Sequence, residues 1–199
     1  WFPIVLAIAI VLLMWTWVRG TKILTEKSRG SSVPLDAFLT SLYARPPHRT
    51  EGTAIFLTAD PDTTPVSLLH NLKHNRVLHA KNVLLTVRTA QTPRVPDAER
   101  IAVEPINDDF KRMIVTYGFM EQPNIPAALA QVRRGGLKYD IMSTSFFMSR
   151  RSLVASPTSG LPPWQDHLFI YLARNAGSPV EYFNLPANRV IEVGTQIEI

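Results

Sequence analysis

The chain begins with the stretch WFPIVLAIAIVLLMWTWV (residues 1–18), in which no side chain is charged. Hydrocarbon cannot hydrogen-bond a peptide backbone, so an apolar stretch of this length satisfies its own backbone as a helix. At ~1.5 Å rise per residue, about 18 to 20 residues nearly cross a bilayer core of ~30 Å. The stretch therefore predicts a transmembrane helix.

The charges that come after this stretch predict its direction. Arg19, Lys22, Lys27 and Arg29 gather immediately after it, and basic residues collect on the cytoplasmic side of a span. Trp15 and Trp17 precede the cluster, where amphipathic rings suit the headgroup boundary. We expect residues after about 20 to be cytoplasmic. A signal peptide would carry its charges before the apolar stretch, and a buried helix of a soluble protein would have a polar face.

Composition limits what the rest of the chain can be. The formal net charge is +5, but residues 1–32 hold four basic side chains and one acidic side chain, so residues 33–199 carry 17 basic against 15 acidic. This near balance argues against nucleic-acid binding. Cysteine is absent, which excludes disulfides, thiolate catalysis and sulfur-bound zinc. The length after residue 32 suits one ordinary domain.

The first part of that domain predicts a βαβ unit. Residues 53–58 form a short apolar run that Asp60-Pro61-Asp62 ends as a turn. Thr64 and Pro65 predict the start of a helix that reaches about Arg76. Residues 81–89 then contain a continuous apolar run, which is typical of a strand covered on both faces. Such a unit indicates an α/β domain.

The later segments predict further elements and a mixed sheet. Two strand-like runs at 100–106 and 110–119 are joined by Asn107-Asp108-Asp109, which predicts an antiparallel hairpin. The remaining predictions are helices at 34–42, 126–134 and 163–174, the second of them closed by Gly135-Gly136, and strands at 143–153 and 189–199. The fold class is therefore one transmembrane helix followed by an α/β domain with a mixed sheet. The predicted boundaries are 1–24 for the helix and its basic flank, 25–32 for a linker or frayed helix end, and 33–199 for the cytoplasmic domain.

Histidines form the first group of candidate site residues. His70 and His74 are four apart on one predicted helix face, as in zinc-binding pairs, and His79 is near in sequence. The segment between the pair, Asn71-Leu72-Lys73, lacks the glutamate of a zinc hydrolase motif. Hydrogen-bonded structural histidines are the simpler interpretation, and no metal ligand is assigned.

Charged side chains form the second group. Asp108 and Asp109 are adjacent acids at a predicted turn, which favours solvated turn formers. Arginines at 133, 134, 150 and 151 would contact phosphate if the fold brought them together. The phosphate-loop, dinucleotide and hydrolase-elbow motifs are all missing from the sequence. We therefore predict that the chain is not an enzyme, with no catalytic residue and no cofactor.

Three ordered motifs resemble one protein family. They are Leu69-His70-Asn71-Leu72-Lys73-His74-Asn75 with Val77-Leu78-His79, then Tyr117-Gly118-Phe119-Met120-Glu121, and finally Leu185-Pro186, Arg189-Val190 and Val193-Gly194-Thr195-Gln196. Together they resemble the C-terminal region of the bacterial Kup family of potassium uptake transporters. The likeness runs from the apolar helix to the last strand. It implies that the chain is the last transmembrane helix plus the cytoplasmic domain of such a transporter.

The resemblance also implies a function for the whole protein. Kup-family proteins are proton-coupled potassium importers of the inner membrane, multi-pass and with a core similar to LeuT. The partners implied are the bilayer, the remainder of the transporter and, in the full-length protein only, potassium ion and proton; a homodimer is left open. Potassium paths are built from intramembrane polar groups, and the apolar stretch has only Thr16 in its interior. We therefore expect this region to act in regulation or assembly rather than in the ion path.

Two alternatives stay open at this point, an anchored binding domain and, after it, an anchored enzyme. A self-standing, membrane-anchored α/β domain would use the arginines named above to sense a small anionic ligand. A regulatory cyclic dinucleotide, implied by the resemblance for some relatives, has no binding motif that we can identify in this sequence.

Overall fold

The computed structural model describes residues 1–30, 32–134, 143–156 and 160–199. Contacts divide the chain into two compact units. The helix unit comprises Trp1–Ser32, Arg151–Gly177 and Gly194–Ile199, and the sheet unit comprises Val33–Arg150 and Ser178–Val193.

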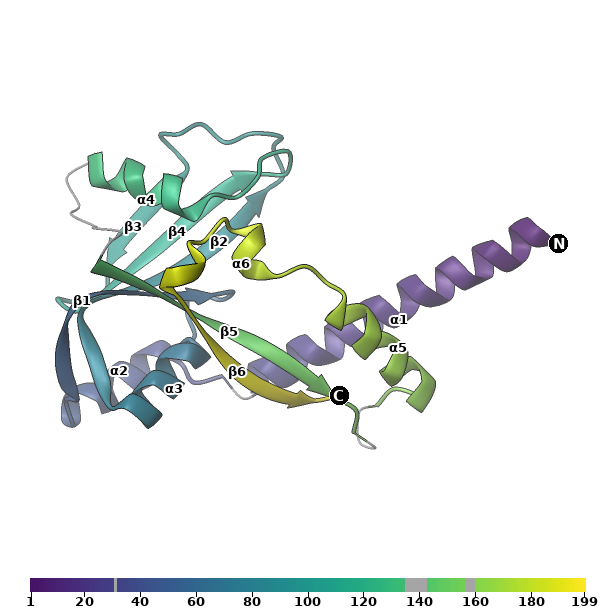
Figure 1. The fold of residues 1–199 in the computed structure, drawn as a ribbon, viewed down its shortest axis with the longest axis horizontal. Helices are drawn as coiled ribbons and strands as arrows, with labels where there is room; N and C mark the ends of the chain where they lie inside the picture. The colour runs from purple at the N-terminus through teal and green to yellow at the C-terminus, as the bar shows by residue number, and fades with distance from the viewer. Residues whose placement is uncertain (31, 135–142, 157–159) are drawn as a thin grey trace. The chain divides into compact units, whose positions relative to one another are not determined.

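The order of elements matches the predicted one closely (Figure 1). The helices are α1 (Phe2–Gly30), α2 (Leu35–Ala44), α3 (Val66–Asn75), α4 (Ile125–Arg134), α5 (Pro163–Arg174) and the short α6 (Pro179–Tyr182), followed by a 3-10 turn at Ala187–Arg189. The strands are β1 (His48–Thr58), β2 (Val77–Ala90), β3 (Ile101–Pro105), β4 (Phe110–Gly118), β5 (Thr144–Val154) and β6 (Val190–Glu198). Every predicted helix and strand is present; α6 and the 3-10 turn were not predicted. Gly135-Gly136, the predicted close of α4, lies outside the described residues.

A six-stranded mixed sheet, in the order β3-β4-β2-β1-β5-β6, confirms the predicted fold class. β1 pairs in parallel with β2 and with β5, and β2 pairs in parallel with β4. The predicted βαβ unit and the antiparallel β3–β4 hairpin are both confirmed. In the hairpin turn, the Asn107 side-chain oxygen accepts hydrogen bonds from the backbone N–H groups of Asp109 and Phe110, at 3.1 and 2.8 Å.

The two faces of the sheet unit bury separate cores, because side chains alternate along each strand. On one face Phe56, Leu84 and Phe110 pack with α2 and α3. On the other face Ile55, Leu85 and Phe146 pack with α4. Figure 1 shows α2 and α3 on one side of these strands and α4 on the other. Helices on both faces explain why β2 reads as a continuous apolar run.

Two boundaries of the βαβ unit differ from the prediction. Thr64 does not cap α3, because Pro65 is the residue before the helix and Thr64 is buried with no side-chain hydrogen bond in the described part of the chain. At the other end Arg76 takes a left-handed conformation (φ 56°) and its backbone N–H donates to the Leu72 carbonyl oxygen. The left-handed residue ends the helix abruptly, so β2 starts at Val77 rather than at residue 81.

Candidate functional site

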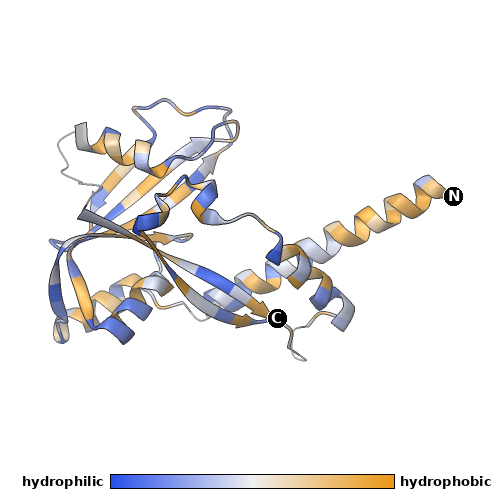
Figure 2. Ribbon diagram, in the orientation of Figure 1, coloured by the Kyte–Doolittle hydropathy of each residue, from blue (hydrophilic) through white to orange (hydrophobic). Residues whose placement is uncertain are grey.

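Helix α1 exposes more large apolar side chains than any other described element. It runs for 29 residues and is the one described helix that is long and apolar enough to cross a membrane, judged by length and composition. Its buried residues are only Thr16 and Gly20. In Figure 2 the ribbon of the N-terminal part of α1 is coloured almost throughout as hydrophobic. An exposed apolar surface of this extent is typical of a membrane or protein contact.

The helix unit has a small core of its own, built where α1 meets α5. Phe169 of α5 is 1% exposed, and its ring centroid lies 5.6 Å from that of Trp17. Gly20 makes this approach possible, since a Cβ at that position would lie 2.3 Å from the Phe169 ring. Ile23 and Leu24 continue the contact on the next turn of α1. Sequence analysis missed this pairing, because Gly20 and Phe169 are far apart along the chain.

Basic side chains follow the apolar part of α1, and two of them make hydrogen bonds within the helix unit. The Arg19 guanidinium donates a hydrogen bond of 2.8 Å to the Gly160 carbonyl oxygen and lies 6.0 Å from the centre of the Trp15 ring. The Lys27 ammonium donates a hydrogen bond of 2.9 Å to the Glu198 carbonyl oxygen. Two members of the predicted basic cluster, Arg19 and Lys27, are thus bound to the later segments of the helix unit, and Lys22 and Arg29 are exposed.

The candidate histidines do not assemble into a metal site in the described residues. His70 and His74 lie together on α3, with ring centroids 5.7 Å apart. His79 lies on β2 against the Phe147 ring, and burial lowers the pKa of its imidazole. The described part of the chain contains no group of three or more His, Cys, Asp or Glu side chains placed to hold a metal ion.

The acidic pair at the hairpin turn splits into two roles. Asp108 is exposed, as a solvated turn residue would be. Asp109 forms an ion pair with Arg49, including one hydrogen bond of 2.6 Å, and accepts a hydrogen bond of 3.2 Å from the Tyr43 hydroxyl. The hydrogen bond from Arg49 holds the pKa of the Asp109 carboxyl below its usual value. The solvated interpretation is therefore wrong for Asp109, which ties the hairpin to β1.

The arginine hypothesis receives little structural support. Arg150 pairs with Glu192 at 3.5 Å and is exposed. The side chains of Arg133 and Arg134 lie outside what the structure describes. Arg151 is exposed, and the predicted convergence of the four arginines on a phosphate stays a prediction.

A partly buried ion pair lies just after β4 and was missed by sequence reasoning. Glu121 accepts hydrogen bonds from Arg100 at 2.9 Å and from the backbone N–H groups of Gly118 and Val95 at 2.7 and 3.2 Å. These donors, with Arg100 the largest contribution, lower the pKa of the Glu121 carboxyl to about 2. Arg100 also lies 5.1 Å from the centre of the Tyr117 ring. The network fixes the segment between β2 and β3 against the end of β4, which is a structural role.

Open α/β sheets bind ligands at the carboxyl ends of their parallel strands. The usual place is between two neighbouring strands whose connecting helices lie on opposite faces of the sheet. Here that point lies between β1 and β5. The turn after β1 is covered by the chain itself: the Thr64 N–H donates to the Val33 carbonyl oxygen (2.9 Å), and the Leu35 N–H donates to the Asp62 carbonyl oxygen (3.2 Å). The covering segment favours a structural use of this edge.

Comparisons with known proteins give the family. The profile described as the K+ potassium transporter C-terminal domain matches residues 51–199. A protein from Caulobacter vibrioides (strain NA1000 / CB15N), named "Probable potassium transport system protein Kup", is 58% identical over all 199 residues. Proteins of the same description from Nitrobacter winogradskyi and Bradyrhizobium sp. (strain BTAi1), the latter named Kup 2, are 56% and 54% identical, again over the whole chain.

The alignment covers all of this chain but only 30% to 32% of each of these relatives. No solved structure matches the chain. The profile begins within β1 and ends at the last residue, and the relatives extend the match through α1. The chain therefore belongs to the family of the K+ potassium transporter C-terminal domain, and its sequence corresponds to the C-terminal portion of Kup potassium transport proteins.

Proposed function

We propose that this chain is the C-terminal part of a proton-coupled potassium importer of the bacterial inner membrane. In this proposal α1 is the last transmembrane helix, and the residues after about 20, including the domain 33–199, are cytoplasmic. The observation that carries the proposal is the match of all 199 residues of this chain to 30% of a protein named as a potassium transport protein, together with the exposed apolar side chains of α1. The four basic residues after the span support the cytoplasmic direction.

The domain acts in regulation or assembly, not in the ion path and not as an enzyme. An ion path needs polar groups near the bilayer midplane. Within the apolar stretch of α1, Thr16 is the interior polar side chain, and it is buried within the helix unit. A lone helix of this kind supports anchoring. The potassium and proton sites belong to segments of the transporter that this chain does not include.

The self-standing anion sensor is the second candidate and has less support than the transporter. It required the arginines to converge on a ligand, and Arg150 instead pairs with Glu192. No contact in the described part of the chain favours it.

Uptake and topology measurements test the proposal in a full-length protein that contains this chain. In a bacterium lacking other potassium importers, the full-length protein should restore growth and rubidium uptake at low potassium. Removal of residues 33–199 should reduce uptake or the amount of protein in the membrane. A reporter fused after Ile199 should be active in the cytoplasm. A periplasmic reporter signal would contradict the direction of α1, and full uptake with normal protein levels after the deletion would contradict a regulatory or assembly role.

A further inference from the structure

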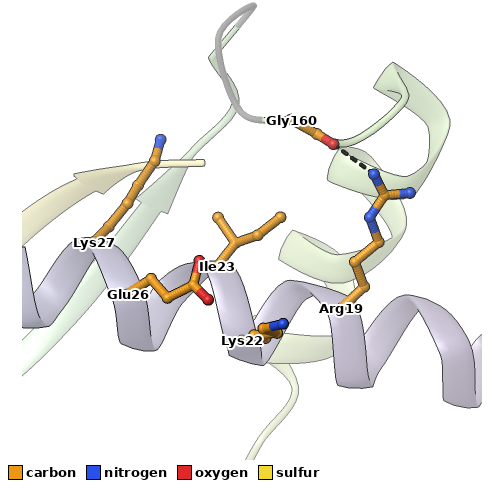
Figure 3. A pocket seen from close by; sticks show the side chains of 6 residues that line it. All are labelled: Arg19, Lys22, Ile23, Glu26, Lys27 and Gly160. Carbon is orange, nitrogen blue, oxygen red and sulfur yellow. Dashed lines mark hydrogen bonds between the residues drawn. The ribbon is translucent and has the colours of Figure 1, made fainter.

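A cavity opens at the point where the apolar part of α1 ends. It has a volume of about 480 Å³ and is lined by Arg19, Lys22, Ile23, Glu26, Lys27 and Gly160, all within the helix unit (Figure 3). We call it the boundary pocket. Its walls come from successive turns of α1 and from the residue that precedes α5 by three positions.

The charge of the boundary pocket favours an anion. Three basic side chains line it against one carboxylate, that of Glu26. Arg19 is already oriented by its hydrogen bond to Gly160 and by the Trp15 ring, and that bond uses one N–H, so further donors remain for a ligand. Lys22 makes no hydrogen bond or ion pair to any residue in the described ranges, so its ammonium group is available. Guanidinium and ammonium groups together match phosphate oxygens.

The position of the pocket along α1 favours a ligand that belongs to the membrane surface. The eighteen uncharged residues before Arg19 span roughly 27 Å as a helix, close to the thickness of the hydrocarbon core. Trp15 and Trp17 lie at the last turn of that stretch and are 52% and 41% exposed. On α5, which packs against α1 in the same unit, Trp164 and Tyr171 are exposed as well. Exposed aromatic rings of this kind prefer the headgroup region.

We propose that the boundary pocket binds the phosphate-bearing headgroup of an anionic lipid. Arg19 and Lys22 contact the phosphate, Ile23 is the apolar side chain in the pocket lining, and the acyl chains lie along the apolar residues that precede Arg19. The inference rests on the proposed function in one respect, that α1 spans the bilayer. Basic pockets at the cytoplasmic ends of membrane helices take such headgroups, helped by the negative charge of that leaflet.

Lipid retention by the 199-residue chain tests the proposal. The chain is placed in nanodiscs of phosphatidylcholine with 20 mol% phosphatidylglycerol, released into neutral detergent, and the lipids that stay bound are counted by native mass spectrometry. Phosphatidylglycerol should be retained well above its share of the bilayer. Lys22→Gln should reduce that preference about fivefold, the effect of one basic group near an anionic surface, whereas Glu26→Gln should increase it.

Lys73→Gln is the matched control, because Lys73 is an exposed lysine of α3 in the sheet unit and the charge change is the same. It should leave the preference unchanged. Lys22 makes no described contact, so its loss should not affect folding, which circular dichroism checks. Retention in proportion to bilayer composition, or an equal loss in both lysine variants, would overturn the proposal.

An experiment with inorganic phosphate distinguishes a lipid headgroup from a free phosphate ion as the ligand. At 10 mM it should neither displace retained phosphatidylglycerol nor raise the melting temperature of the chain in lipid-free neutral detergent. Stabilisation by phosphate that Lys22→Gln abolishes, with no lipid preference, would assign the pocket to a soluble anion and overturn the lipid proposal. Failure here leaves the proposed transport function untouched, because topology and uptake measure that separately.

Discussion

Helix α1 and the strands of the sheet unit use the same apolar residue types in opposite ways. Ile55, Phe56 and Leu84 are 0% exposed, because α2, α3 and α4 cover the sheet on both faces. Ile4 and Val11 of α1 are more than half exposed. The difference shows that composition alone does not determine which surface is a core. Helices of the same protein cover the apolar side chains of the strands, and we expect lipid to cover those of α1.

The largest effect should come from opening the sheet core. Phe56 is fully buried and stacks on Phe147 with ring centroids 4.8 Å apart. Phe56→Ala should lower the free energy of unfolding by about 3–5 kcal/mol, because it leaves a cavity between packed layers. Urea titration of the chain in detergent micelles, followed by circular dichroism, measures this. Ile191→Ala, at a position 47% exposed on β6, is the control and should change stability little. Equal losses would contradict the protein-covered core.

The next effect tests the lipid side of the comparison. Ile8→Arg places a charge in the middle of the apolar stretch and should raise the free energy of membrane insertion by about 2.5–3.5 kcal/mol. The inserted fraction, measured in a microsomal insertion assay, should fall accordingly. Ile191→Arg carries the same change at an exposed site outside the span and should insert as the original chain does. Unchanged insertion of Ile8→Arg would contradict the assignment of α1 to the membrane.

A smaller effect should come from crowding the α1–α5 contact. Gly20→Ala adds a methyl group where the Phe169 ring leaves no room, and such overpacking costs about 1–3 kcal/mol. The midpoint temperature of thermal unfolding should fall. Gly30→Ala is the matched control, since a Cβ there has no neighbour within 4 Å. Combining Gly20→Ala with Phe169→Leu should recover part of the loss, and strictly additive losses would contradict direct contact between the two positions.

The smallest effect should be the dependence of stability on pH, which comes from the Glu121 carboxylate of the sheet unit. Because the folded pKa of Glu121 is about 2, below its ordinary value of 4.5, its contribution to stability is present above about pH 4.5 and is lost as the pH falls toward 2. Glu121→Gln should therefore melt at a lower temperature than the original chain at pH 7, with the difference shrinking between pH 4.5 and pH 2. Glu99→Gln, an exposed neighbour, should show no such dependence. A pH-independent difference would contradict a role for the carboxylate charge.

Local sequence signals were enough for most of the fold. Asn107 predicted the hairpin, because its side chain satisfies the backbone of the turn that it begins. The helix at 163–174 was predicted with the bounds that α5 has. The start of β1 was missed, since a register shift between Thr50 and Thr53 and a left-handed Gly52 (φ 103°) interrupt the alternation of the strand. The apolar run that predicted a strand therefore began only at residue 53.

The candidate sites were harder to predict, because they depend on contacts between distant segments. Arg19 was recognised as part of a basic cluster, but its partner Gly160 is 141 positions away. Asp109 was interpreted as solvated because nothing near it in sequence indicates Arg49. Glu121 belongs to a motif that carried the family resemblance, yet its bond to Arg100 needs the segment between β2 and β3 to fold back. Sequence patterns predict what one element requires, whereas pairing of this kind requires the tertiary fold.

The position of β1 in the sheet has a consequence for synthesis of the protein. Its two neighbours are made at very different times: β2 comes almost at once after β1, but Phe146, the partner of Ile55 on β5, is about 90 residues later. At about 5–20 residues per second, β1 has one open edge for roughly 5–20 s while the ribosome is still translating. An unpaired edge of this kind can join a strand of another nascent chain. Slow translation between α3 and β5 should thus increase aggregation of the nascent domain, even though β1 of the finished domain has β2 on one edge and, from Thr53 to Phe56, β5 on the other.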